Sequence, residues 1–127
     1  GDDIIAYLCE YFTDDICSFT INTYVYTGGA HGVSELKGYN YNIKTGEALS
    51  FIKTFDFRPS QINKNIFAKA KGDNLLLFDN FKGIEEYPEN FYLLDAKTPI
   101  IIFQQYEIAP YSSGIIKVPI IEETEHI

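Results

Sequence analysis

The chain has 127 residues, of which 46% are hydrophobic and 16% aromatic, with ten Tyr and ten Phe. This length and composition indicate one domain with a substantial core and exclude disorder along the whole chain. The net charge of −8 argues against nucleic acid and against an anionic membrane surface as partners.

The acidic residues concentrate at the two ends of the chain. The first 34 residues carry five acidic residues and no Lys or Arg, and residues 85–127 carry eight acidic residues and two basic ones. An acidic surface would attract a cationic partner, although solubility alone commonly explains such a charge. No apolar run approaches the roughly 20 residues that span a bilayer, so we expect no direct membrane insertion. Because Gly1 stands where Met would begin a gene product, we expect that preceding parts of a parent protein are absent.

The first two segments, residues 4–12 and 16–27, flank the turn-forming cluster Thr13-Asp14-Asp15. The second segment alternates apolar and polar residues, which is typical of a half-buried antiparallel strand. Its apolar set is Cys17, Phe19, Ile21 and Val25. The first segment fits a helical apolar stripe as well as a strand, so its residues alone leave both structures open.

Residues 36–43 predict a strand that ends in the turn Lys44-Thr45-Gly46, and a short strand or 3₁₀ turn should follow within residues 47–57. The main helix is predicted over residues 59–71, because Pro59 suits a first turn and Gly72 ends a helix. Its apolar stripe consists of Ile62, Ile66, Phe67 and Ala70.

The second half of the chain predicts strands over residues 91–95, 99–106 and 115–121, followed by an acidic tail over residues 122–127. The run Ile100–Phe103 is apolar on both faces, which indicates a central strand covered by the helix. Residues 73–90 stay ambiguous between helix and strand, with Leu75–Phe78 expected to be buried. The predicted fold class is α+β: a single domain over residues 1–127, with a mostly antiparallel twisted sheet and one main helix packed on one face.

Cys9 and Cys17 are expected not to be bonded to each other. If residue 12 pairs with residue 16, Cys9 lies opposite Phe19 and Cys17 opposite Tyr11, which leaves the two Cα atoms about 7–8 Å apart. A disulfide requires less than about 6.8 Å. If residue 13 pairs with residue 16 instead, the cysteines fall on opposite faces.

Residues that carry chemistry are few. His31 is the one histidine outside the tail, and with two nearby cysteines it does not supply the three or four converging ligands of a zinc site. The acidic pairs lack EF-hand spacing, and the glycine-rich loop lacks the phosphate-loop ending. We therefore expect no metal, no cofactor and no catalytic residue. A hydrolase centred on His31 and Ser112 is an alternative, without an identifiable third member or nucleophile elbow.

Two loops carry the binding prediction. The first, Tyr26–Gly32, has the sequence YTGGAHG, and its three glycines indicate positive φ angles or a very close backbone approach. Gly28, Gly29, His31 and Gly32 are therefore predicted to be structural, with the His31 ring held by a backbone carbonyl or a tyrosine hydroxyl.

The second loop, Tyr106–Gly114, combines a proline-fixed backbone with aromatic surface. We predict that Gly28–Gly32 of the first loop and Ala109–Gly114 of the second lie close together at one end of the sheet. The predicted partner-binding residues are Tyr26, Tyr106, Pro110, Tyr111 and Ser112. Tyrosine gives a large contact area for little loss of entropy and suits both protein recognition and glycan stacking, although tyrosines that simply cap sheet edges are as common.

Four segments in this order resemble a known family: Tyr26–Gly32, Asn42–Gly46 (NIKTG), Asn90–Leu93 (NFYL) and Tyr106–Tyr111 (YEIAPY). Over about residues 4–121 the chain is similar to the conserved C-terminal domain, itself of unknown function, that is shared by the lysozyme-sensing anti-sigma-V factors and by some surface peptidoglycan deacetylases of Gram-positive bacteria. The resemblance also favours a β-hairpin over residues 4–27.

The resemblance implies an extracytoplasmic domain of a cell-surface or membrane-anchored protein. It implies non-catalytic recognition of lysozyme or another cationic extracellular protein in an anti-sigma-type sensor. The alternative that it implies is a cell-wall glycan-binding accessory domain of a peptidoglycan deacetylase. The deacetylase activity itself does not carry over, because its catalytic residues belong to a separate domain.

Overall fold

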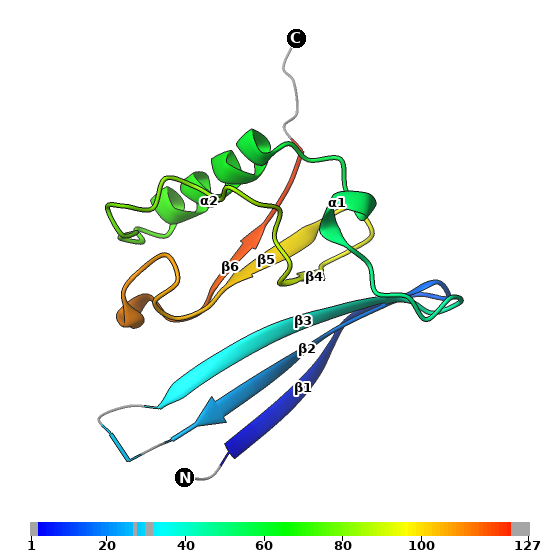
Figure 1. Cartoon of the computed structure of the whole chain (residues 1–127), viewed down its shortest axis with the longest axis horizontal. Helices are drawn as coiled ribbons and strands as arrows, with labels where there is room; N and C mark the ends of the chain where they lie inside the picture. The colour runs from blue at the N-terminus through cyan, green and yellow to red at the C-terminus, as the bar shows by residue number, and fades with distance from the viewer. Residues whose placement is uncertain (1–2, 27, 30–31, 123–127) are drawn as a thin grey trace.

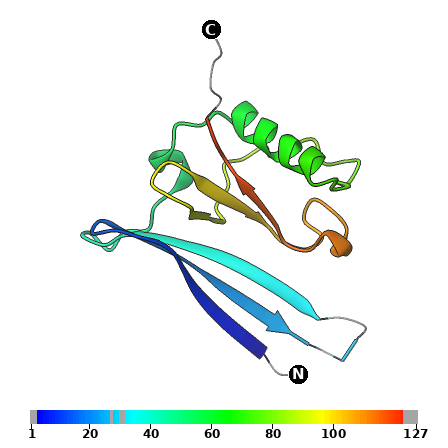
Figure 2. The same cartoon turned by 180° about the vertical axis from the view of Figure 1, so that it is seen from behind.

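The computed structural model describes residues 3–26, 28–29 and 32–122. The described strands are β1 (Asp3–Phe12), β2 (Ile16–Val25), β3 (Val33–Asn42), β4 (Phe91–Leu93), β5 (Pro99–Phe103) and β6 (Ile116–Pro119). The described helices are α1 (Phe51–Thr54), α2 (Pro59–Gly72) and the 3₁₀ turn η1 (Tyr111–Ser113). Figure 1 shows their arrangement, and Figure 2 shows it from behind.

The elements form three layers. Sheet A contains the antiparallel strands in the order β1-β2-β3, and sheet B contains β4-β5-β6, also antiparallel. Helix α2 covers the face of sheet B that lies away from sheet A (Figures 1 and 2). The α+β class and the single main helix are therefore correct, but the predicted single sheet is wrong, because the strands divide into two sheets.

The central strand β5 is buried along its whole length, as its apolar run predicts. Ile101 and Phe103 belong to the main core with Ile62 and Ile66 of α2, whereas Ile100 and Ile102 belong to a smaller cluster that contains Leu36 of sheet A. Strand β5 thus packs against the helix on one face and against sheet A on the other, so its run of apolar residues needs no alternation.

The predicted α2 stripe is buried except for Phe67, whose ring contacts Phe81 at a centroid distance of 5.7 Å. Residues 73–90 form neither of the two predicted structures, because the segment crosses the molecule as turns and irregular chain. The prediction that Leu75–Phe78 is buried is wrong: Leu76 is 81% exposed, and the other three residues are only partly buried. The strands β4, β5 and β6 are shorter than predicted, and residues 47–57 contain a one-residue bridge at Ala48 and the short helix α1.

The buried face of β2 is its polar face, which is the reverse of a simple half-buried strand. Ser18 and Thr20 are buried, whereas the apolar set that includes Phe19 lies on the outer face of sheet A. The reason is that the edge of β4 meets sheet A. The Leu93 N–H donates to Ser18 Oγ at 2.8 Å, Ser18 Oγ–H donates to Asn40 Oδ1 at 2.7 Å, and Asn40 Nδ2 donates to the Phe91 carbonyl at 2.8 Å. Polar residues are needed there because buried peptide groups must be satisfied.

The outer edge of β3 is closed by side-chain amides of residues that flank strands β4 and β5. Asn90 accepts from the Gly38 N–H and donates to the Leu36 carbonyl, and Gln104 bonds both peptide groups of Leu36. Gln105 accepts from the Ser34 N–H at 3.1 Å. These three amides take the place of a neighbouring strand.

Cys9 and Cys17 are free, which confirms the prediction that they are not bonded to each other. Cys9 lies opposite Phe19 as expected, but Cys17 lies opposite Phe12 and not Tyr11. A register shift between Cys9 and Tyr11 causes the difference, since the extra residue Glu10 moves the end of β1 by one position.

Gly38 lies where the two sheets come closest, so we predict that Gly38→Ala is strongly destabilising. A Cβ atom at this position would lie 1.8 Å from the Phe91 carbonyl oxygen, which belongs to the backbone and cannot rotate away. We expect a loss of at least about 1–3 kcal/mol in the free energy of unfolding, measured by denaturant titration.

The matched control is Gly72→Ala at the end of α2, where an added Cβ meets nothing within 4 Å. That variant should be neutral or slightly stabilising. Equal effects at the two glycines would contradict the close approach of β3 to β4.

Candidate binding site

The Tyr106–Gly114 loop starts from a turn that is fixed to β3. The Glu107 N–H donates to the Gln104 carbonyl at 3.1 Å, and the Gln104 N–H donates to Glu107 Oε1 at 2.9 Å. The side chains of Gln104 and Gln105 simultaneously bond the edge of β3. The turn is therefore held from both sides, which places Tyr106 at its tip.

Tyr106 has an unusual backbone for a non-glycine residue, with φ of 67°. This conformation costs an L-residue roughly 1–2 kcal/mol. The side chain is 61% exposed, and its ring lies 5.6 Å from that of Tyr111 at an interplanar angle of 42°. An exposed aromatic residue on strained backbone gains little from burial, so packing of the Tyr106 ring alone does not explain the strain.

Tyr111 joins the two predicted loops. Its hydroxyl donates to the Gly32 carbonyl at 2.9 Å. Gly32 itself is buried beneath Tyr24, and a Cβ atom there would lie 2.4 Å from the end of the Tyr24 ring. Tyr24 and Tyr111 thus both contact Gly32, and Tyr106 lies beside Tyr111. The prediction that the two loops lie together is confirmed.

The remainder of the second loop is fixed by burial and by local turns. Ile108 and Ala109 are each 3% exposed, and the Ile108 carbonyl accepts from the Phe78 N–H at 2.8 Å. Pro110 then starts the 3₁₀ turn η1, which ends at Gly114 with φ of 68°. The loop is consequently preorganised, with its tyrosines on a rigid support.

The structure brings together most of the predicted binding residues. Tyr106, Pro110, Tyr111 and Ser112 share one loop, and Pro110 and Ser112 are exposed. Tyr26 lies directly after β2 and is exposed, as are Gly28 and Gly29. His31, Thr27 and Ala30 lie outside the described residues, so the expected role of His31 and its pairing with Ser112 stay predictions.

Sequence reasoning missed the residues that hold the loop in place. Gln104 and Gln105 carry no signal in the sequence, since glutamines after an apolar strand are ordinary turn residues. Glu107 lies inside a motif that resembled a family, but its contact with the Gln104 N–H depends on the turn geometry.

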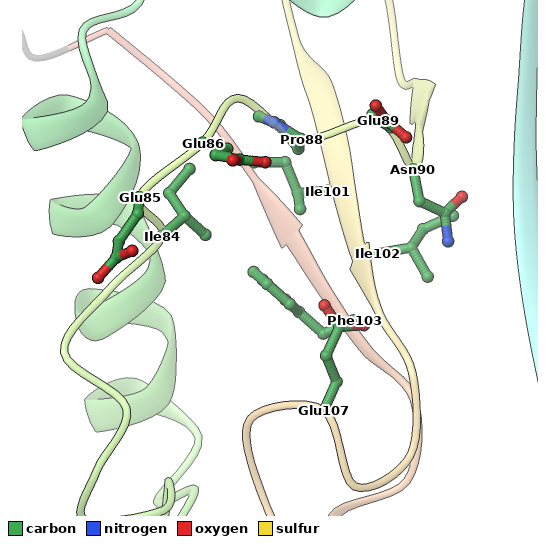
Figure 3. A pocket seen from close by; sticks show the side chains of 10 residues that line it. All are labelled: Ile84, Glu85, Glu86, Pro88, Glu89, Asn90, Ile101, Ile102, Phe103 and Glu107. Carbon is green, nitrogen blue, oxygen red and sulfur yellow. The ribbon is translucent and has the colours of Figure 1, made fainter.

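An acidic cavity of about 540 Å³ lies beside this loop, between the segment before β4 and sheet B (Figure 3). Its ten lining residues include four glutamates and no basic residue. The glutamates are Glu85, Glu86, Glu89 and Glu107. Ile84, Ile101 and Phe103 give the same cavity an apolar wall. Glu107 thus belongs to both the cavity and the tyrosine loop.

An ion pair between Lys37 and Glu35 lies on the outer face of β3. Lys37 Nζ lies 3.2 Å from Glu35 Oε1, and this hydrogen bond raises the pKa of Lys37 above its ordinary value. Both side chains are more than half exposed, so the pair adds little to stability.

Within the part of the chain that the structure describes, no group of three or more His, Cys, Asp or Glu residues could hold a metal ion. Among the described helices, none has the length and apolar character to cross a membrane.

Comparison with known proteins gives a family and a fold. Residues 40–121 match the family described as "Protein of unknown function (DUF3298)". No curated protein matches the chain. The crystal structure of a DUF3298 family protein from Pseudomonas aeruginosa PAO1 matches with a TM-score of 0.70 and 18% sequence identity, over 93% of this chain and 57% of that chain.

A crystal structure of a DUF3298 family member from Bacteroides fragilis NCTC 9343 matches with a TM-score of 0.68 and 20% identity, over 91% of this chain and 49% of that chain. The chain therefore spans about half the length of these two solved proteins. At these identities the likeness shows the fold and does not transfer an activity. The family indicates no catalytic class.

The strained backbone at Tyr106 makes a specific prediction about glycine. Tyr106→Gly and Tyr106→Ala both remove the ring, but only glycine adopts a φ of 67° without strain. We expect the Gly variant to be more stable than the Ala variant by about 1 kcal/mol in denaturant unfolding.

The control pair is Tyr39→Gly and Tyr39→Ala in β3, where the backbone is extended and Ala should be the more stable of the two. If Tyr106→Ala is also more stable than Tyr106→Gly, the turn does not have the described geometry.

Proposed function

The chain belongs to the DUF3298 family of proteins of unknown function, and from its geometry we propose that it is a non-catalytic recognition module for a cationic extracellular protein. The observation that carries this proposal is the junction of a rigid tyrosine loop with an acidic cavity at Glu107. One surface supplies aromatic contact area, and the adjoining one supplies negative charge.

The cavity has the chemistry to take a lysine or arginine side chain. The aliphatic stem of such a side chain would pack against Ile84, Ile101 and Phe103, and its charged end would meet the carboxylates at the rim. Figure 3 shows Glu86 close to Ile101 and Glu107 close to Phe103, with Glu85 and Glu89 farther out. One oxygen of Glu107 already accepts from the Gln104 N–H, so the other three glutamates would contribute most of the attraction.

The loop would act as the contact that slows dissociation. Tyr106 is exposed, and its position is fixed by the turn, so little conformational entropy is lost when a partner packs against it. Dispersed carboxylates mainly raise the rate of association, because their field extends beyond contact distance. The two parts of the surface therefore have different kinetic roles.

Lysozyme is the cationic protein that we propose as the partner. The support is the resemblance to the lysozyme-sensing anti-sigma-V factors, together with the net charge of −8 and the acidic cavity. In this proposal the domain lies outside the cytoplasm on a cell-surface or membrane-anchored parent protein.

We predict that two sets of substitutions have separable effects on binding to immobilised hen lysozyme at low salt. Tyr106→Ala should raise the dissociation rate about tenfold, the effect of losing roughly 1.4 kcal/mol at a hot spot, and leave the association rate nearly unchanged. The double variant Glu85→Gln/Glu86→Gln should slow association several-fold and flatten its dependence on salt.

The control for charge is Asp14→Asn/Glu47→Gln, which removes the same number of exposed carboxylates at the far end of the molecule. This variant should retain most of the association rate. Equal slowing by both double variants would show that only the net charge matters. Absence of binding at high micromolar concentration, by this chain and by its full-length parent, would remove the proposal.

The exposed rings of Tyr106 and Tyr26 favour a second candidate, which is binding of cell-wall glycan. Tyrosine rings stack on sugars, and such contacts lack the salt dependence of charge attraction. Binding of soluble peptidoglycan fragments that persists at high salt and is lost in Tyr106→Ala, with no binding of lysozyme, would place the glycan function first.

A further inference from the structure

Strand β1 is a long edge strand with exposed apolar residues on both of its faces. It has a single neighbour, β2, in the described sheet. Tyr7 is 71% exposed and Ile5 53% on the outer face of sheet A, and Leu8 is 60% exposed on the inner face. Sheet B lies over the β3 side of sheet A (Figures 1 and 2), and although Tyr11 packs against the main core, residues 5–9 of β1 are exposed. Edge strands of this kind invite pairing with another strand.

The two edges of sheet A are treated differently. The β3 edge is closed, because the peptide N–H groups of Ser34, Leu36 and Gly38 donate to side-chain amides that flank strands β4 and β5. Antiparallel strands alternate the side to which their peptide groups point. The residues of β2 that pair with Ser34, Leu36 and Gly38 therefore direct their peptide groups toward β1. By the same alternation in the pairing of β2 with β1, the peptide groups of Ile5, Tyr7 and Cys9 point to the open edge.

The open edge continues into an apolar face. The Phe19 ring stacks with Tyr39 at 5.2 Å and with Tyr41 at 6.2 Å on the outer face of sheet A. Phe19 lies opposite Cys9, and the neighbouring Ile21 lies opposite Tyr7. The charged pair Glu35–Lys37 lies at the far side of this face, on β3. Next to β1 the surface is therefore apolar.

We propose that β1 pairs in antiparallel fashion with β1 of a second copy of this chain, with the twofold axis at Tyr7. In that register Ile5 faces Cys9 of the second copy, and Ala6 faces Leu8, so every central pair is apolar. The open peptide groups of Ile5, Tyr7 and Cys9 in the two copies would form about six hydrogen bonds. The two sheets A would become one continuous six-stranded sheet.

A second copy fits this edge because the sequence of β1 is self-complementary. The apolar residues Ile5–Cys9 are symmetric about Tyr7, and the acidic residues Asp3 and Glu10 lie toward the ends of the strand. No two carboxylates then face each other, even though each copy carries a net charge of −8. Glu10 is also turned inward, where it accepts a hydrogen bond from Thr20 Oγ1 at 3.0 Å.

Sedimentation velocity at physiological salt, from low to high micromolar concentration, tests the proposal on the chain as it stands. We expect a monomer–dimer equilibrium for the unaltered chain. Tyr7→Lys should weaken it at least tenfold, because two ammonium groups would meet at the twofold axis. Leu76→Lys makes the same change of charge at an exposed residue outside sheet A and should leave the dimer intact.

Tyr7→Pro is the second variant, and it tests the backbone pairing itself. Because the Tyr7 N–H points away from β2, proline removes no hydrogen bond within the chain but removes donors at the axis. Far-UV circular dichroism monitors its folding, and Tyr7→Lys decides the result if the Pro variant unfolds. A chain that stays monomeric throughout, or a dimer that survives Tyr7→Lys, would overturn the proposal.

Discussion

The packing of the β4 edge into the face of sheet A is the constraint on which the rest of the structure depends. The Phe91 carbonyl and the Leu93 N–H lie on the edge of β4 that does not face β5, and they are satisfied by Asn40 and Ser18 of sheet A. This contact requires a polar inner face on sheet A and a glycine at position 38, where the backbones approach most closely. It also explains why the apolar residues of β2 lie on the outer face, since the inner positions are taken by the groups that complete the hydrogen bonds of sheet B.

Side chains that satisfy peptide groups of the facing sheet also position the candidate binding site. Asn90, Gln104 and Gln105 close the edge of β3, and two of these three amides belong to the turn that carries Tyr106. The position of the exposed tyrosine is thereby coupled to the packing of the two sheets, and the backbone strain at Tyr106 is supported by contacts on either side of it. Preorganisation of this kind lowers the entropic cost of binding, which is the advantage of building a recognition surface on such a framework.

Patterns that involve one element were predictable from the sequence, and patterns that involve two were not. The α2 helix and the buried β5 follow from local periodicity, because Ile62, Ile66 and Ile100–Phe103 pack as their spacing indicates. The loop junction followed from special-geometry residues, and the Tyr111–Gly32 hydrogen bond now accounts for it. The sequence could not predict which face of β2 is buried, because alternation defines two faces but does not say which of them a second sheet will cover. Gln104 and Gln105 were missed for the same reason, since their partners lie some 70 residues away in the chain.

The two proposals concern opposite sides of the molecule, and they reinforce each other physically. The acidic cavity is lined by residues of β5 and of the segment before β4, whereas β1 lies at the edge of sheet A that is farthest from sheet B (Figure 1). Pairing through β1 would leave both cavities and both tyrosine loops uncovered and would present two copies of the surface in a fixed relation. A single loop and cavity form a small contact, for which weak affinity is the physical expectation. Two of them on one rigid sheet would convert the second contact into an intramolecular one, so a partner with repeated cationic or glycan groups would be held far longer than a partner with one.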